Sequence, residues 1–266
     1  MRNIRLSIEY RGTNYAGWQI QNRVQRTEYR EQRRIQRPQR KTIQEALEKA
    51  LSKILREKVR VIGSGRTDAG VHALSQSANF KTESKLPLQK LQMALNGVLP
   101  QDIRITMAQE AGADFHSRFC AKSKIYRYLI LSRKYNSSFL RRSVCFCSYP
   151  LDLRLMRREA AALKGRHDFK SFCASGSSSK DTRRNLKQIS IRKMSLGLSA
   201  TPVIAIDIEA DGFLYKMARN IVGTLIEIGR GKLPAGSLSR ILKARERCLA
   251  GETAAACGLY LLKVKY

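Results

Sequence analysis

Apolar and polar residues follow either a strand or a helix period over most of the chain. The alternation from Ile4 to Tyr10 predicts an amphipathic strand. A capping box at Thr42–Glu45 is followed by apolar residues at helical spacing up to Ile54, which predicts a helix. Further strands are expected within residues 59–62, 75–80, 103–107, 124–130, 204–208 and 258–266, and further helices within 88–98, 152–163 and 213–228. Because strands and helices are intermixed, the pattern predicts an α+β fold with mixed or antiparallel sheets flanked by helices.

The pattern divides near the middle of the chain. A length of 266 residues allows one large domain or two modest ones. Around Ala111–Gly112 the succession of elements ends and a new one begins. We therefore expect an N-terminal α/β domain at residues 1–112 and a C-terminal α/β domain at 113–266.

The charge of the chain points to a polyanionic partner. Lys and Arg number 51 against 21 Asp and Glu, which gives a formal net charge of +30. Nucleic acid is the natural partner of such a field, because binding its phosphates releases counterions. A membrane surface is the rival, but no apolar run approaches the roughly 20 residues that span a bilayer, and Met1 begins no signal segment. We expect a soluble, cytoplasmic protein without membrane association.

One segment departs from the globular pattern. Residues 22–41 carry eight basic residues against Glu28 and Glu31, with few apolar positions. Such a segment cannot bury much of itself. It is either a solvated, disordered loop or a basic arm that follows RNA phosphates.

The strongest candidate for chemistry is the segment Gly63–Ala73. It holds Arg66, Asp68 and three glycines directly after the predicted strand at Val59–Ile62. Glycines there permit a tight turn and a close approach of substrate, so Asp68 would stand exposed at a strand end. A turn without function is the alternative, since Gly-Asp-rich turns are common. The segment does not match a phosphate-binding P-loop, because no Gly-Lys-Ser/Thr follows at the required spacing.

Cysteine and histidine positions give no metal or cofactor signature. The six cysteines are scattered, and we expect them to be reduced thiols. Cys145 and Cys147 lack the spacing of a zinc knuckle, and the three histidines form no paired ligand spacing. No nucleotide-cofactor fingerprint is found either. We therefore expect no metal and no cofactor.

Two further residues have alternative interpretations. In the predicted strand at 124–130, Tyr126 and Tyr128 share one face, whereas Arg127 and Leu129 share the other. Tyr126 is then a core residue or a ring that grips a flipped base. Arg219, beside the apolar stripe of 213–228, is most simply a solvated flank.

The Asp68 segment resembles the Gly-Arg-Thr-Asp-x-Gly-Val-His-Ala signature of the TruA-type tRNA pseudouridine synthases. Other stretches are similar to motifs of the same family, with Ala218 standing where valine is usual and residues 22–41 where a shorter connection is usual. These stretches are Tyr10–Gln19, Asp114–Phe119, Lys124–Tyr128, Gly165–Phe172, Phe213–Gly223 and Gly258–Leu261.

The resemblance implies a fold, a reaction and a role for four residues. It implies the two-domain pseudouridine synthase fold with a basic central cleft, and isomerisation of uridine at positions 38, 39 and 40 of the tRNA anticodon arm by a homodimer. Asp68 would be the catalytic residue, Arg219 would pair with it, and Tyr126 would pack on the substrate base. Arg66 would enter the space left by the flipped uridine or grip its phosphate.

The implied reaction fits what the chain contains. Pseudouridine forms when the bond from C1′ to N1 breaks, the base rotates, and C1′ joins C5, so nothing is oxidised. The reaction needs an ionised carboxylate beside C1′, either to trap a sugar cation or to remove a sugar proton, and Asp68 fits both roles. The alternative is a noncatalytic RNA-binding protein with the same fold, which could lose Asp68 freely.

Overall fold

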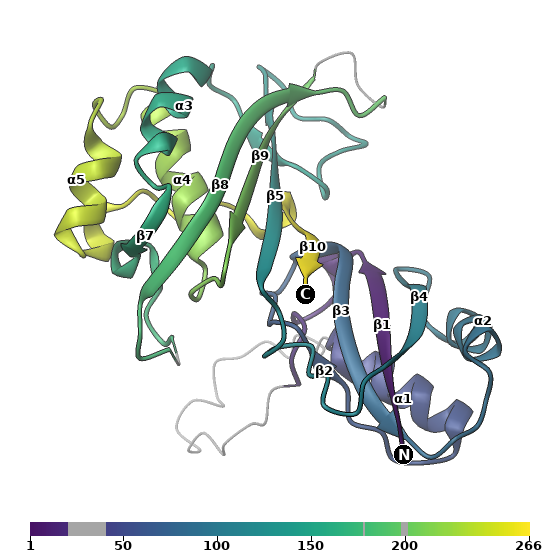
Figure 1. Ribbon diagram of the computed structural model, residues 1–266. Coiled ribbons are helices and arrows are strands. Elements are labelled where there is room, and N and C mark those ends of the chain that lie inside the picture. The colour runs from purple at the N-terminus through teal and green to yellow at the C-terminus, as the bar shows by residue number, and fades with distance from the viewer. Residues whose placement is uncertain (21–40, 178, 198–201) are drawn as a thin grey trace, which may run out of the picture. The chain divides into compact units, whose positions relative to one another are not determined.

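The computed structural model describes residues 1–20, 41–177, 179–197 and 202–266, which form ten β-strands and five α-helices (Figure 1). The predicted α+β class is confirmed. Of the predicted basic insertion at 22–41, residues 22–40 lie outside the described residues. The described chain divides into two compact units, Met1–Gly70 with Ser77–Arg118 (unit 1) and Val71–Gln76 with Phe119–Tyr266 (unit 2). The domain limits 1–112 and 113–266 stay a prediction.

Unit 1 is a small sheet with two helices. Strand β1 pairs antiparallel with β4, and β2 pairs antiparallel with the later part of β3. Both helices bury an apolar stripe, and Thr42 Oγ1 accepts a hydrogen bond from Glu45 N at 3.2 Å, as the capping box predicts. The elements are β1 (Arg2–Tyr10), a 3-10 turn (Gly12–Asn14), α1 (Ile43–Leu55), β2 (Ile62–Gly63), β3 (His72–Thr82), α2 (Leu88–Val98) and β4 (Ile103–Ala111).

Unit 2 is a larger sheet with three helices. Strands β5, β9, β8 and β7 pair antiparallel in that order, β10 pairs antiparallel with β5, and β6 runs parallel to β5. The first residues of β3 pair parallel with β10. The elements are β5 (Ser123–Ser132), β6 (Cys145–Cys147), α3 (Leu153–Ala161), β7 (Gly165–Asp168), β8 (Arg183–Met194), β9 (Val203–Ala210), α4 (Met217–Gly229), α5 (Ser237–Ala244), β10 (Leu259–Lys265) and 3-10 turns at Lys170–Phe172, Arg247–Leu249 and Ala256–Gly258.

Helix α4 is the central helix of unit 2. Almost all of its residues are buried, and it contacts α3 and α5, which gather with it on one side of the sheet (Figure 1). The apolar stripe predicted a helix from Phe213, but α4 begins at Met217, because Lys216 before it adopts a left-handed conformation with φ 58°. Phe213 therefore precedes the helix.

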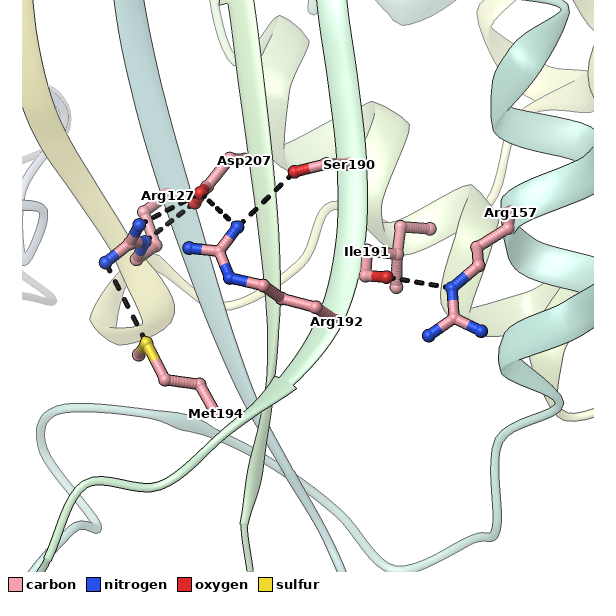
Figure 2. Close-up of polar contacts among 7 residues, drawn as sticks. All are labelled: Arg127, Arg157, Ser190, Ile191, Arg192, Met194 and Asp207. Atoms are coloured by element: carbon pink, nitrogen blue, oxygen red, sulfur yellow. Dashed lines mark hydrogen bonds and ion pairs between the residues drawn. The ribbon is translucent and has the colours of Figure 1, made fainter.

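The two faces of β5 differ as the sequence predicts. Leu129 and Leu131 join an apolar cluster with Val203 and Ala205. Along the same face, the Asp207 carboxylate of β9 accepts hydrogen bonds from Arg127 Nε at 2.7 Å and from Arg192 Nη1 at 2.8 Å (Figure 2). Burial alone would raise the pKa of Asp207, but the two guanidinium groups outweigh it and hold that pKa below its ordinary value.

Replacing Asp207 with asparagine should lower the free energy of unfolding at pH 7 by about 2 kcal/mol, because the charge-assisted hydrogen bonds from Arg127 and Arg192 are lost or weakened. A carboxyl group whose pKa is lowered by folding stabilises the fold above its unfolded pKa of about 3.9 and loses that contribution as pH falls through the folded pKa. Urea titrations between pH 7 and 2.5 should therefore show the gap between wild type and variant closing below about pH 4. A gap that is constant with pH would contradict the ion pair.

Candidate active site

The Asp68 loop connects β2 to β3, and its residues up to Gly70 belong to unit 1. It leaves β2 at Gly63 and enters β3 at His72. Asp68 is half-buried, between Thr67, which is buried, and Ala69, which is exposed. Gly70 has φ 81°, a conformation that favours glycine. The carboxylate thus stands in an irregular loop, directly after a buried residue. It is half-buried, whereas the sequence predicted an exposed side chain at a strand end.

The Tyr10–Gln19 motif holds this loop in place. Thr67 O accepts a hydrogen bond from Trp18 N at 3.1 Å, and Thr67 Oγ1 is hydrogen-bonded to the Tyr10 hydroxyl at 2.8 Å. Gly17, with φ 98°, lies so close that an added Cβ would be 2.5 Å from Thr67 O and 3.1 Å from Asp68 C. The two most specific sequence motifs of unit 1 therefore form one structure, which holds the peptide that carries Asp68.

Arg66 lies on the exposed side of the same loop. Its Nε donates a 2.7 Å hydrogen bond to Gln19 Oε1, so the Tyr10–Gln19 motif orients this side chain as well. Trp18 is 2% exposed, and an added Cβ on Gly63 would meet its ring at 2.4 Å. Trp18 is thus a core residue beneath the loop.

Tyr126 is a central residue of unit 2. It lies on β5 between Ile208 of β9 and Leu261 of β10, and it is 7% exposed. The Phe213 ring meets it edge to face, with 4.8 Å between centroids. The structure therefore fixes the orientation of this ring by packing on neighbouring strands and on the residue that precedes α4.

Arg219 lies in the first turn of α4 and is half-buried, so it is not a solvated flank. Its Nε donates a 2.7 Å hydrogen bond to Ala254 O, and Ala254 N donates to Arg219 O at 3.2 Å. The same segment is held from β5, since the Tyr128 hydroxyl donates to Ala255 O at 2.7 Å. Burial raises the pKa of Tyr128 well above its usual value, so the hydroxyl stays a donor. The Arg219 guanidinium is thereby held by the segment Ala254–Ala255, which Tyr128 in turn holds to β5.

Asn220 is a structural residue of this site that the sequence interpretation missed. It is fully buried, its Nδ2 donates to Phe172 O at 2.7 Å, and its Oδ1 accepts from Thr253 Oγ1 at 2.6 Å and from Arg247 Nη2 at 3.1 Å. An amide on a buried helix needs such partners. The sequence signal that could have indicated this role is the position of a polar residue, Asn220, beside the apolar stripe of the helix.

The four predicted site residues therefore fall into two pairs. Arg66 and Asp68 share the loop of unit 1, whereas Tyr126 and Arg219 belong to unit 2. Across the described residues, no group of three or more His, Cys, Asp or Glu side chains could hold a metal ion. Among these same residues, no helix has the length and apolarity to cross a membrane.

Comparisons with known proteins agree on one family. The tRNA pseudouridine synthase family matches residues 7–120 and 160–266. A protein named tRNA pseudouridine synthase A from Thermoanaerobacter sp. (strain X514) is 44% identical over 266 residues, which is all of both chains. Proteins of the same name from Acetivibrio thermocellus and Caldicellulosiruptor bescii are 43% and 44% identical, also over the full length of both chains.

The chain belongs to the tRNA pseudouridine synthase family. Arg66, Asp68 and Arg219 lie inside the two matched ranges, whereas Tyr126 lies between them. The full-length relatives cover that intervening segment as well.

Proposed function

We propose that this chain isomerises uridine to pseudouridine in tRNA, with Asp68 as the catalytic carboxylate. The observation that carries the proposal is the family match across the Asp68 loop, which here is a fixed structure rather than a plain turn. The high positive charge of the chain supports a tRNA substrate, because each phosphate contact releases counterions.

The proposed chemistry needs only groups that the chain supplies. The C1′–N1 bond breaks, N1 takes up a proton, the base rotates, and C1′ bonds to C5, which loses its proton to water. Asp68 either attacks C1′ to form a covalent intermediate or removes a sugar proton. In both routes the carboxylate has to be ionised when the glycosidic bond breaks.

Three further residues have proposed roles. Arg219 pairs with Asp68 and places a positive charge beside the carboxylate while the glycosidic bond breaks. Tyr126 holds the detached base during its rotation, and the packing of its ring against Phe213 supports a fixed stacking surface. Arg66, exposed and oriented by Gln19, enters the space of the flipped uridine or binds its phosphate.

The proposal extends to the substrate region and the assembly. By its resemblance to the family, the enzyme acts on positions 38, 39 and 40 of the anticodon arm as a cytoplasmic homodimer with a basic central cleft, and it uses no cofactor. Mapping pseudouridine site by site in a treated tRNA pool tests the positions, and sedimentation of the purified protein tests the dimer.

Tritium release tests the activity itself. Unmodified tRNA with tritium at C5 of its uridines is incubated with the protein, and label in water is counted. Release that is stoichiometric with pseudouridine supports the enzyme. Tight tRNA binding without release would identify a noncatalytic RNA-binding protein instead.

Replacing Arg219 with alanine should slow turnover by about 100-fold while tRNA affinity stays near wild type, because a fixed electrostatic group is lost rather than a general phosphate contact. Single-turnover rates and filter-binding affinities separate the two effects. Arg219→Lys, which keeps the charge, should recover part of the rate. The matched control is Arg158→Ala on α3, an exposed arginine whose loss removes the same charge. Equal rates for Arg219→Ala and this control would refute the role.

A further inference from the structure

A basic pocket lies in unit 1, outside the residues proposed for catalysis. Its volume is about 450 Å³. Residues from strands and loops contribute to its lining, and three of them are cations. The lining residues are Lys58, Arg60, Ile62, Asn79, Lys81, Ala113, Asp114, Phe115 and His116. All of these residues belong to unit 1, so the pocket is complete within one compact unit.

Three cations line this pocket, one on β3 and two in the segment before β2. In the segment before β2, Val59 and Val61 are 4% and 2% exposed, whereas Lys58 and Arg60 are exposed and face away from the core. Ile62 is paired with Asn79, and Lys81 follows two residues later on the same face of β3. The three cations are exposed, and Asp114 is the one carboxylate in the lining. The pocket therefore carries net positive charge.

The opposite wall is held rigidly by two buried amides. Asn3 Nδ2 donates to Gly112 O and Phe115 O, each at 2.9 Å. Asn79 is 2% exposed, its Nδ2 donates to Asn3 Oδ1 at 3.0 Å, and its Oδ1 accepts from Ser117 N at 2.9 Å. The segment 112–117 is thus tied to the sheet at several points, and the pocket is preformed.

The wall also offers an aromatic ring and an imidazole. The Arg5 guanidinium lies 5.5 Å from the centroid of the Phe115 ring, which fixes that ring. His116 Nδ1 accepts a hydrogen bond from Arg118 N at 3.2 Å, so in the neutral imidazole the proton is on Nε2. Cations, a ring donor and an aromatic surface together suit a phosphate with its attached nucleoside.

We propose that this pocket binds a backbone phosphate of the RNA substrate, away from the nucleotide that is modified. The identity of the ligand as tRNA rests on the proposed function. RNA is favoured over free phosphate because the cations are exposed and divided between β3 and the segment before β2, which suits a chain of phosphates rather than one enclosed anion. The pocket contributes affinity and placement of tRNA and leaves the chemical step unchanged.

The test compares two double variants with the same change of charge. Arg60→Gln/Lys81→Gln removes two cations of the pocket, and Lys53→Gln/Lys90→Gln removes two exposed cations of α1 and α2 that do not line it. The dissociation constant of unmodified tRNA is measured over a range of salt concentrations for both variants and for wild type. The pocket variant should bind about tenfold more weakly at physiological salt, with a salt slope lower by about 1 to 2, since each lost phosphate contact removes close to one unit.

The remaining measurements separate the outcomes. The single-turnover rate at saturating tRNA should equal wild type for both double variants. Equal affinities and slopes for the two variants would overturn the proposal, and so would a loss of rate without a loss of affinity. If inorganic phosphate at matched ionic strength raised the unfolding temperature of wild type while the two variants bound tRNA equally, the ligand would be free phosphate. Wild type could bind tRNA about tenfold more tightly than the pocket variant and yet release no tritium. That result would support the phosphate-binding pocket and contradict the proposed enzymatic activity.

Discussion

Replacement of Asp68 by asparagine is expected to lower the rate of uridine isomerisation by about 10⁴-fold, because the reaction loses its nucleophile or its base. Asparagine has the same shape and keeps hydrogen-bonding atoms, so the loop held by Thr67, Tyr10 and Trp18 should stay folded. Tritium release and pseudouridine formation under single-turnover conditions measure the loss. Affinity for tRNA should be unchanged or slightly higher, since a negative charge is removed from an RNA-binding surface.

The control for Asp68→Asn is a carboxylate change of equal charge elsewhere in unit 1. Glu9 is exposed on β1, and Glu9→Gln should keep full activity. Thermal unfolding of both variants checks that the fold survives. An Asp68→Asn protein that is folded and still releases tritium at more than a few per cent of the wild-type rate would remove Asp68 from the mechanism, whichever of its two roles is considered.

Local signals in the sequence predicted most elements of the fold. The capping box before α1 and the alternation along β5 each depend on neighbouring residues, and both are confirmed in the structure. The strand predicted at 59–62 was longer than the observed ladder, because only Ile62 and Gly63 find partners on β3. Propensity along one segment does not report whether a partner strand is present.

Long-range contacts could not be predicted in the same way. The Tyr10–Gln19 motif and the Asp68 loop were both recognised, but nothing in either predicted that Gly17 packs on the Thr67 carbonyl. The hydrogen bond from Arg219 to Ala254 O could not be predicted for a similar reason. Its acceptor is a backbone carbonyl, which every residue has, so the residue type gives no signal. The residue type states which side chain is present, whereas a close approach of two backbone segments is indicated in the sequence only by a glycine.

Replacing Gly223 with alanine is expected to lower both the free energy of unfolding and the rate of turnover. This glycine is buried in α4, and an added Cβ would lie 1.7 Å from Glu252 O, closer than any real contact. Alanine is favoured over glycine in a helix by about 1 kcal/mol, but forced overpacking against a backbone carbonyl costs about 3 kcal/mol or more. Gly223→Ala should therefore lower the free energy of unfolding by about 2 kcal/mol or more, as measured by urea titration. Displacement of the segment should also move Ala254 O away from Arg219, so turnover should fall in the folded fraction.

Gly97 provides the matched comparison, because it lies in α2 and an added Cβ there would meet nothing within 4 Å. Gly97→Ala should therefore stabilise the protein by about 0.5–1 kcal/mol, the helix propensity gain without a clash. Opposite signs for the same substitution in two helices would show that the contact with Glu252, and not the helix itself, requires glycine at residue 223. If Gly223→Ala were as stable as wild type and as active, residues 251–254 would be free to move from α4, and the anchoring of Arg219 through Ala254 would have no part in catalysis.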